Sequence, residues 1–159
     1  MGPDPSSLSL ESYPIEVAVA VGAPDETTPL VWSTLIQPPP DWLASRTWEC
    51  ASERVHGIAL ADLGAGLTPR AAMTELNARL PRDSVVLSDG GAYDPLWLGK
   101  LARAAKVRPS FQLWDIKLAF VLDRRRLDRC TAALAGDEAE HRAAADCLRL
   151  WHAVKAALI

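Results

Sequence analysis

The sequence predicts a single α/β domain with a mixed β-sheet and helices on its faces. Its 159 residues suffice for one domain with a hydrophobic core, and no repeat or linker divides residues 1–159. Eight of the 12 prolines lie in the first 40 residues, and none follows Pro109. Because proline interrupts helices, strands and turns are expected at the start of the chain and helices towards its end.

Composition excludes several classes of protein. Apolar residues make up 49% of the chain and charged residues 23%, which is ordinary for a globular protein and excludes intrinsic disorder. The net charge of -3 excludes a polybasic nucleic-acid binder of the histone type. The longest apolar run, residues 15–23, is too short to cross a bilayer, and no secretory signal is visible, so no membrane partner is expected. Three unclustered cysteines are expected to be reduced thiols of a cytoplasmic protein: Cys50, Cys130 and Cys147.

Two apolar segments near the start predict an antiparallel hairpin. Residues 15–21 are rich in Val and Ile and lie between Pro14 and Gly22, which is typical of a strand. Residues 24–27 form a turn signal, and residues 30–36 give the second strand, which a run of prolines ends.

A helix and a buried strand are expected next. Thr68 has the side chain of a helix cap, and Pro69 follows it at the first helical position. Residues 70–80 then place apolar side chains at four-residue spacing, as in an amphipathic helix. Residues 84–88 are a short apolar run that predicts a strand.

The second half of the chain predicts further helices. Asp94, which a proline follows, is expected to cap a helix that ends near residue 105. Residues 111–114 are expected to be extended, and Asp115 to cap a helix through residue 122. The last helix is expected from near residue 137 to residue 158.

Three segments, residues 55–58, 88–98 and 141–146, hold side chains that could carry chemistry. The first lies in the long connection before the helix at 70–80, the second runs from a strand end through glycines into a helix, and the third lies near the start of the last helix. The candidate residues in these segments are His56, Gly57 and Ile58; Tyr93 and Asp94; and His141 and Asp146.

The spacing of His141 and Asp146 restricts where the last helix begins. Within one regular helix, a five-residue offset leaves the two side chains about 140° apart, so that they do not share a face. They can converge if His141 lies in the preceding loop and the helix begins near Arg142. Asp137 offers an earlier start as a helix cap, and the sequence leaves both alternatives open.

These segments resemble motifs of the DnaQ-like 3'–5' exonucleases, the DEDD superfamily with a catalytic histidine. Residues 93–98 resemble the second motif, in which an aromatic-Asp pair precedes an aromatic-Leu pair. Residues 141–146 are similar to the third motif, His-x-Ala-x-x-Asp. Residues 13–18 resemble the second strand of the family, and residues 56–58 stand where the family has His-Gly-Ile. The order and approximate separations agree over nearly the whole chain.

The resemblance implies an RNase H-like fold and hydrolysis of single-stranded DNA or RNA from the 3' end. Asp94 and Asp146 would help to bind two divalent cations, Mg²⁺ or Mn²⁺, which prefer carboxylate oxygens. His141 would be the general base, a role that suits a side chain with a pKa near neutrality. The remaining candidates would contact the substrate: His56, Gly57, Ile58 and Tyr93.

The first motif departs from the family pattern of Asp-x-Glu at the end of the first strand. The register places Asp4 at the Glu position, where it could bind a cation, and Gly2 at the Asp position, where it could not. Most of the first strand of the RNase H-like sheet would then precede Met1. Three explanations stay open: a start codon assigned too far downstream, a truncation, or a protein that has lost catalysis and serves in binding or as a scaffold.

Ordinary structural roles compete with these functional ones. Asp94 could be only a helix cap, His141 a surface histidine and His56 a turn histidine. Residues 124–126 are all arginine and are expected to form a solvated helix end. Most of the six tryptophans are expected in the core, in particular Trp32, Trp97, Trp114 and Trp151.

Overall fold

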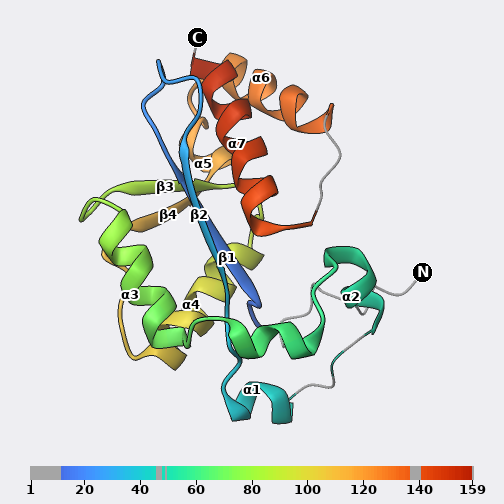
Figure 1. Ribbon diagram of the computed structural model, residues 1–159. Helices are drawn as coiled ribbons and strands as arrows, with labels where there is room; N and C mark the ends of the chain where they lie inside the picture. The colour runs from blue at the N-terminus through green and yellow to red at the C-terminus, as the bar shows by residue number, and fades with distance from the viewer. Residues whose placement is uncertain (1–11, 46–47, 49, 137–140, 159) are drawn as a thin grey trace.

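The computed structural model describes residues 12–45, 48, 50–136 and 141–158. The chain has the predicted α/β class, with strands concentrated near the start and helices near the end (Figure 1). In order, the elements are β1 (Glu16–Val21), β2 (Leu30–Leu35), α1 (Pro40–Ser45), α2 (Cys50–His56), η1 (Leu60–Ala65, a 3₁₀ helix), α3 (Pro69–Arg79), β3 (Val85–Ser88), α4 (Tyr93–Ala105), β4 (Gln112–Asp115), α5 (Ile116–Ala119), α6 (Arg124–Ala135) and α7 (Ala143–Leu158).

The four strands found among the described residues form two separate pairs. β1 and β2 make the predicted antiparallel hairpin, in a register that places Ala18 opposite Ser33. β3 and β4 are parallel, with Ser88 opposite Asp115. Within the described residues these two pairs are not joined, so the single mixed sheet that the sequence predicts is not formed by them.

One group of helices covers one face of both strand pairs. α3 and α4 pack together there and bury the larger of two cores. Val19 of β1 lies in this core, and Val17 and Val86 pack against it from β1 and β3. The buried members of this core are Val19, Ile36, Trp42, Ala72, Met73, Leu76, Leu80, Leu101 and Ala105.

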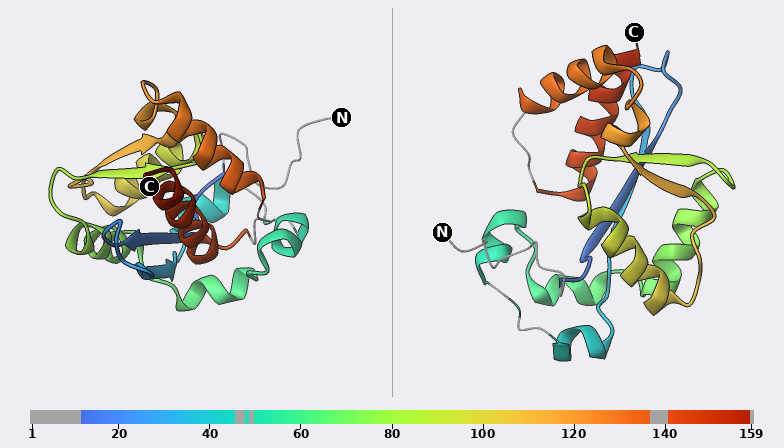
Figure 2. Two further views of the ribbon diagram at one scale, coloured as in Figure 1. Left: turned by 90° about the horizontal axis from the view of Figure 1, so that it is seen from above. Right: turned by 180° about the vertical axis from the view of Figure 1, so that it is seen from behind.

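The last three helices cover the opposite face. α6 and α7 pack against each other, and α7 runs along β1 and β2 (Figures 1 and 2). Leu87 of β3 packs against their core, whose buried members are Ile116, Phe120, Cys130, Leu150, Ala153 and Ala157. Because successive side chains of a strand alternate, Val17 and Val19 of β1 face α3 and α4, and the small side chains of Ala18 and Ala20 face α7.

In the part of the chain that the structure describes, three helices begin at a side-chain cap. The Thr68 hydroxyl accepts a hydrogen bond from the Ala71 N–H at 3.3 Å, as the sequence predicts. Asp115 caps α5 by accepting from the Lys117 N–H at 2.7 Å, which is also predicted, although α5 ends earlier than expected. Asp123 caps α6 in the same way, and the arginines of residues 124–126 form its exposed first turn.

Several expectations about elements are wrong. α4 begins at Tyr93, so Asp94 lies inside its first turn, and the capping position is Ala92, whose side chain makes no capping bond. α7 begins at Ala143 and not near residue 137, while residues 137–140 lie outside the described part of the chain. α1, α2, η1 and α6 were not predicted: the first three are only six or seven residues long, and α6 begins with three arginines in place of an apolar pattern.

The tryptophans also differ in part from the prediction. Trp114 is 40% exposed and belongs to neither of the two described cores, and its Nε1–H donates a hydrogen bond to the Gln112 side chain at 3.2 Å. Trp32 packs against the core of α3 and α4, and Trp97 and Trp151 are half-buried. None of the helices in the described part of the chain combines the length and the apolar character needed to cross a membrane.

Candidate functional site

Asp94 lies just beyond the carboxyl end of β3, where the chain turns into α4. Its Oδ2 accepts a hydrogen bond from the Gly90 N–H at 3.2 Å. A side chain at Gly90 would place its Cβ 2.5 Å from the Asp94 carboxyl atoms. The glycine at this turn therefore allows the carboxylate to lie against the backbone.

The surroundings of Asp94 raise the pKa of its carboxyl group. Burial is the main cause, and the charges of Asp89 and Asp115 act in the same direction. The Gly90 N–H and the Ser88 hydroxyl oppose them by stabilising the charged form. Three acidic residues thus lie at the carboxyl ends of two parallel strands, which is where α/β proteins often bind ligands.

An ion pair links this edge to α7. Arg149 lies 3.4 Å from the Asp89 carboxylate and also donates a hydrogen bond to the Leu134 carbonyl at 3.1 Å. Asp146 is three residues earlier on α7, and side chains at that spacing are neighbours on a helix surface. Its Oδ1 atom is buried. The structure therefore brings Asp146 to the side of α7 that also reaches the end of β3.

His141 lies outside α7, in a left-handed backbone conformation with φ of 54°. Its side chain is exposed. The Asp146 N–H already bonds to the Arg142 carbonyl at 2.9 Å, in the first turn of the helix. Of the two alternatives that the sequence leaves open, the structure has the one with His141 in the preceding loop. Helical geometry therefore does not force His141 and Asp146 apart.

Glu16 fixes the start of α7. Its carboxylate accepts a hydrogen bond from the Ala143 N–H at 2.8 Å, which places a negative charge at the N-terminus of the helix. Arg142 donates to the same carboxylate from Nε and Nη2, and this bond is one of the causes that raise the pKa of Arg142. This pair could not be predicted from the sequence, because the two residues are 126 positions apart.

The segment of His56, Gly57 and Ile58 lies beside the start of α7. His56 ends α2, and its Nδ1 accepts a hydrogen bond from the Ile58 N–H at 3.1 Å. Burial is the main cause that lowers the pKa of His56; the charge of Glu53 and, more weakly, that of Glu16 oppose it, whereas the charge of Arg142 adds to the lowering. Gly57 has φ of +66°, and the Ile58 side chain is 3% exposed.

Tyr93 begins α4 and lies against Trp97, with the ring centroids 5.8 Å apart. The Trp97 Nε1–H donates to the Ser12 hydroxyl at 2.9 Å, and Lys100 donates to the Ser12 carbonyl at 2.6 Å. α4 thus carries Tyr93 and Asp94 in its first turn and anchors Ser12, where the described chain begins.

These positions do not by themselves make a cation site. Within the part of the chain that the structure describes, no group of three His, Cys, Asp or Glu side chains could hold a metal ion. Asp94 and Asp146 therefore belong to no such group there, and Asp4 lies outside the described residues. The described donors alone do not fit the two cations that the resemblance implies.

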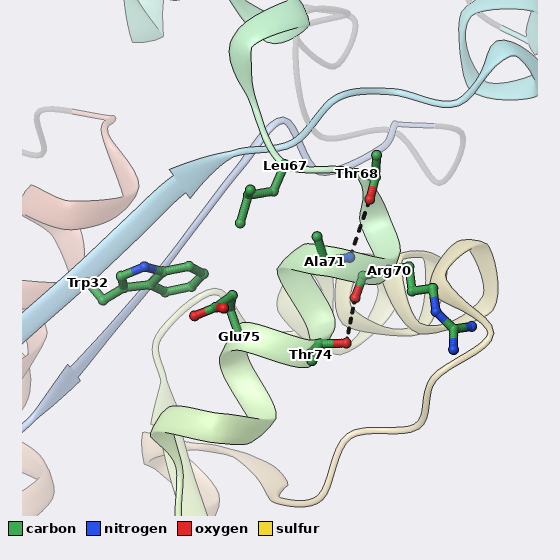
Figure 3. A pocket seen from close by; sticks show the side chains of 7 residues that line it. All are labelled: Trp32, Leu67, Thr68, Arg70, Ala71, Thr74 and Glu75. Carbon is green, nitrogen blue, oxygen red and sulfur yellow. Dashed lines mark hydrogen bonds between the residues drawn. The ribbon is translucent and has the colours of Figure 1, made fainter.

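A shallow hollow of about 480 Å³ lies between β2 and α3, and no candidate residue lines it (Figure 3). Arg79 stacks over the Trp32 ring at 4.4 Å from its centroid. The hydroxyls of Thr68 and Thr74 are engaged in hydrogen bonds within α3 and its cap (Figure 3). The hollow therefore presents few free polar groups and is not the candidate site.

No family model, curated protein or solved structure matches the chain. The candidate site is thus defined by its own residues: the acidic edge at Asp94, and the loop of His141 with its neighbours Glu16 and His56.

Proposed function

We propose that the protein is a 3'–5' exonuclease that hydrolyses single-stranded DNA or RNA from its 3' end. The observation that carries the proposal is the loop before α7, which leaves His141 exposed and five residues ahead of Asp146. A solvent-accessible histidine is the side chain that most often accepts a proton from an attacking water in general-base catalysis.

Two acidic residues beyond the end of β3, Asp89 and Asp94, support the same function. The turn at Gly90 holds the Asp94 carboxylate close to the backbone, and Arg149 holds Asp89 at the end of β3. Both lie where ligands commonly bind in α/β folds, beyond the carboxyl ends of parallel strands. Tyr93 and the segment of residues 56–58 are the proposed contacts to the terminal nucleotide.

We also propose that the reaction depends on Mg²⁺ or Mn²⁺, as the resemblance implies. The carboxylates described do not by themselves fit two such ions. Asp4, outside the described residues, is the further carboxylate that the resemblance offers. The RNase H-like fold is likewise proposed from the resemblance, and the two strand pairs between two groups of helices are compatible with it.

A nuclease assay tests the proposal. The chain is incubated with Mn²⁺ and a single-stranded oligonucleotide labelled at its 5' end, and shortening from the 3' end is expected. His141→Ala should lower the rate by roughly 10²–10⁴, which is the usual contribution of a general base. His152→Ala is the matched control, because His152 is also exposed but lies on the body of α7. An intact oligonucleotide, or equal rates for the two variants, would refute the proposal.

A binding or scaffold protein without catalysis is the second candidate. The specific observation in its favour is that the described residues contain no group of three metal donors. Titration calorimetry with Mn²⁺ separates the two candidates. Two tight sites favour the exonuclease, while the absence of binding together with an intact oligonucleotide favours the scaffold.

A further inference from the structure

The connection from α5 to α6 exposes apolar side chains that neither core covers. Among the large apolar side chains that the structure describes, Leu122 is the most exposed, at 98%. Val121 beside it is 64% exposed, and Leu118 of α5 is 58% exposed. We call these three side chains the apolar tip. Single exposed apolar side chains are ordinary on a protein surface, but a cluster of them indicates a surface that binds a partner.

The backbone of the apolar tip is held in a defined turn. Ile116 and Phe120 are 4% and 8% exposed and anchor the segment in the core of α5, α6 and α7. The Val121 N–H donates to the Leu118 carbonyl at 3.3 Å, and the Asp123 N–H donates to the Phe120 carbonyl at 2.9 Å. The exposure of the tip is therefore a feature of an anchored segment, because the neighbouring apolar side chains are already buried.

Positively charged side chains flank the apolar tip on both sides in the chain. Lys117 comes just before it, and residues 124–126, all arginine, begin α6 just after it; all of these side chains are exposed. The acidic residues nearby are engaged in helix caps or ion pairs: Asp115, Asp123 and Asp128. Over the described ranges, no ion pair engages Lys117 or Arg125. The tip therefore carries an excess of positive charge, although the net charge of the chain is -3.

We propose that the apolar tip and the cations beside it bind the surface of a lipid bilayer that contains anionic lipids. The three apolar side chains enter the boundary between the headgroups and the acyl chains, and Lys117 and Arg125 contact the anionic headgroups. Charge complementarity selects this occupant, because the tip is the place where exposed apolar side chains and unpaired cations adjoin. The contact lies at the membrane surface and requires no membrane-crossing segment.

Two other occupants fit the apolar tip less well. A second copy of the chain in a symmetric dimer would bring the cations of both tips together, where they repel each other. A stable protein interface takes about 20 residues from each partner and has a core poor in charged residues, whereas the tip is small and its cations lie directly beside it. The inference does not depend on the proposed exonuclease function, because the tip contains none of the residues of that function.

Sedimentation with lipid vesicles tests the proposal. The unaltered chain is mixed with vesicles of equal parts phosphatidylserine and phosphatidylcholine, or with vesicles of phosphatidylcholine alone. Binding to the mixed vesicles should be at least about tenfold tighter, because only these carry net negative charge. Salt at about 1 M should weaken this binding, since ions screen the attraction between exposed charges.

Two matched pairs of variants locate the contact on the molecule. Leu122→Ser should lower the affinity for mixed vesicles at least about fivefold, whereas Leu30→Ser, at a leucine that is 76% exposed on β2, should stay within about twofold. Arg125→Glu should also lower it at least about fivefold, whereas Arg70→Glu, at the exposed second residue of α3, should stay within about twofold. Because all four side chains are exposed, the variants should keep the fold, which urea unfolding checks.

Four results would overturn the proposal. In the first, the chain binds neither kind of vesicle or both equally. In the second, Leu122→Ser binds the mixed vesicles as tightly as the unaltered chain does. In the third, sedimentation without lipid shows a dimer that Leu122→Ser dissociates, which would make a second copy of the chain the occupant. In the fourth, a soluble peptide of alternating leucine and glutamate binds the chain more tightly than the mixed vesicles do and loses affinity in Leu122→Ser, which would make an acidic protein segment the occupant.

Discussion

Arg142 and Glu16 form a two-bond ion pair that joins the last helix to the first strand. Arg142 donates to the Glu16 carboxylate from Nε at 3.2 Å and from Nη2 at 3.0 Å. The Glu16 side chain is only 9% exposed, and the Ala143 N–H adds a third bond at 2.8 Å. Since His141 immediately precedes Arg142, this ion pair holds the backbone next to His141, the proposed general base, against β1.

Glu16→Ala should therefore destabilise the protein. Hydrogen bonds to charged groups contribute about 1.5–3 kcal/mol, and the variant also leaves the Ala143 N–H without its acceptor. A loss of about 2 kcal/mol in the free energy of unfolding is expected, because the exposed Arg142 can regain water. Urea unfolding measures it. Glu75→Ala is the control: it removes an exposed pair with Arg79 on α3 and should cost about 0.5 kcal/mol or less. Equal losses in the two variants would contradict this role of Glu16.

The local features of the fold could be predicted because their causes are adjacent in the sequence. The Val-rich run of β1 and the prolines after β2 define the hairpin, and Thr68 and Asp115 cap their helices as expected. Asp94 is the instructive exception. It has the sequence features of a cap, but the Gly90 turn lets its carboxylate reach back to the Gly90 N–H from within the first turn of α4.

The features of the fold and of the candidate site that could not be predicted depend on contacts between residues that are distant in the sequence. Neither Glu16 nor Arg142 indicates its partner, and Arg149 meets Asp89 across 60 positions. The sequences of β1 and β3 also do not show that these two described strands belong to separate pairs, because this depends on where the fold places each pair. The place of His141 could be narrowed to two alternatives from helical geometry, but only the contact between Glu16 and the start of α7 decides between them.

The core between the two strand pairs and α3 can be tested with one substitution. The Met73 side chain is 0% exposed, so Met73→Ala should cost about 2–5 kcal/mol through lost contacts and a cavity. Leu122 is 98% exposed, and Leu122→Ala should change stability by about 0.5 kcal/mol or less. Thermal or urea unfolding of both variants checks the packing. A small effect at Met73 would show that this core is not formed as described.

The lowered pKa of His56 predicts a pH dependence of stability. Burial favours the neutral imidazole in the folded protein, so between the folded pKa and about 6.5 the unfolded chain binds more protons. Stability should therefore fall as the pH drops through this window. In His56→Gln the fall should be smaller, whereas His152→Gln, a change at an exposed histidine, should keep the original slope. Urea titrations at several pH values between 5 and 8 compare the three proteins; parallel curves for His56→Gln and the unaltered chain would contradict the prediction.

Two glycines that flank Asp94 allow the same substitution with opposite expected results. Gly99→Ala lies within α4, where the new Cβ comes no closer than 3.7 Å to Arg103 Nη1, so it should stabilise the helix by up to about 1 kcal/mol. Gly90→Ala places its Cβ 2.5 Å from the Asp94 carboxyl atoms and should cost about 1–3 kcal/mol, because the carboxylate has to move.

The two glycine variants also separate a structural role of Asp94 from a functional one. A displaced carboxylate should reduce the proposed exonuclease rate by about 10-fold or more, since small shifts of an active-site group are costly. Gly99→Ala should leave that rate unchanged. Stability is measured in urea and the rate with the labelled oligonucleotide. If Gly90→Ala loses stability but keeps the full rate, Asp94 serves the turn before α4 and not the reaction.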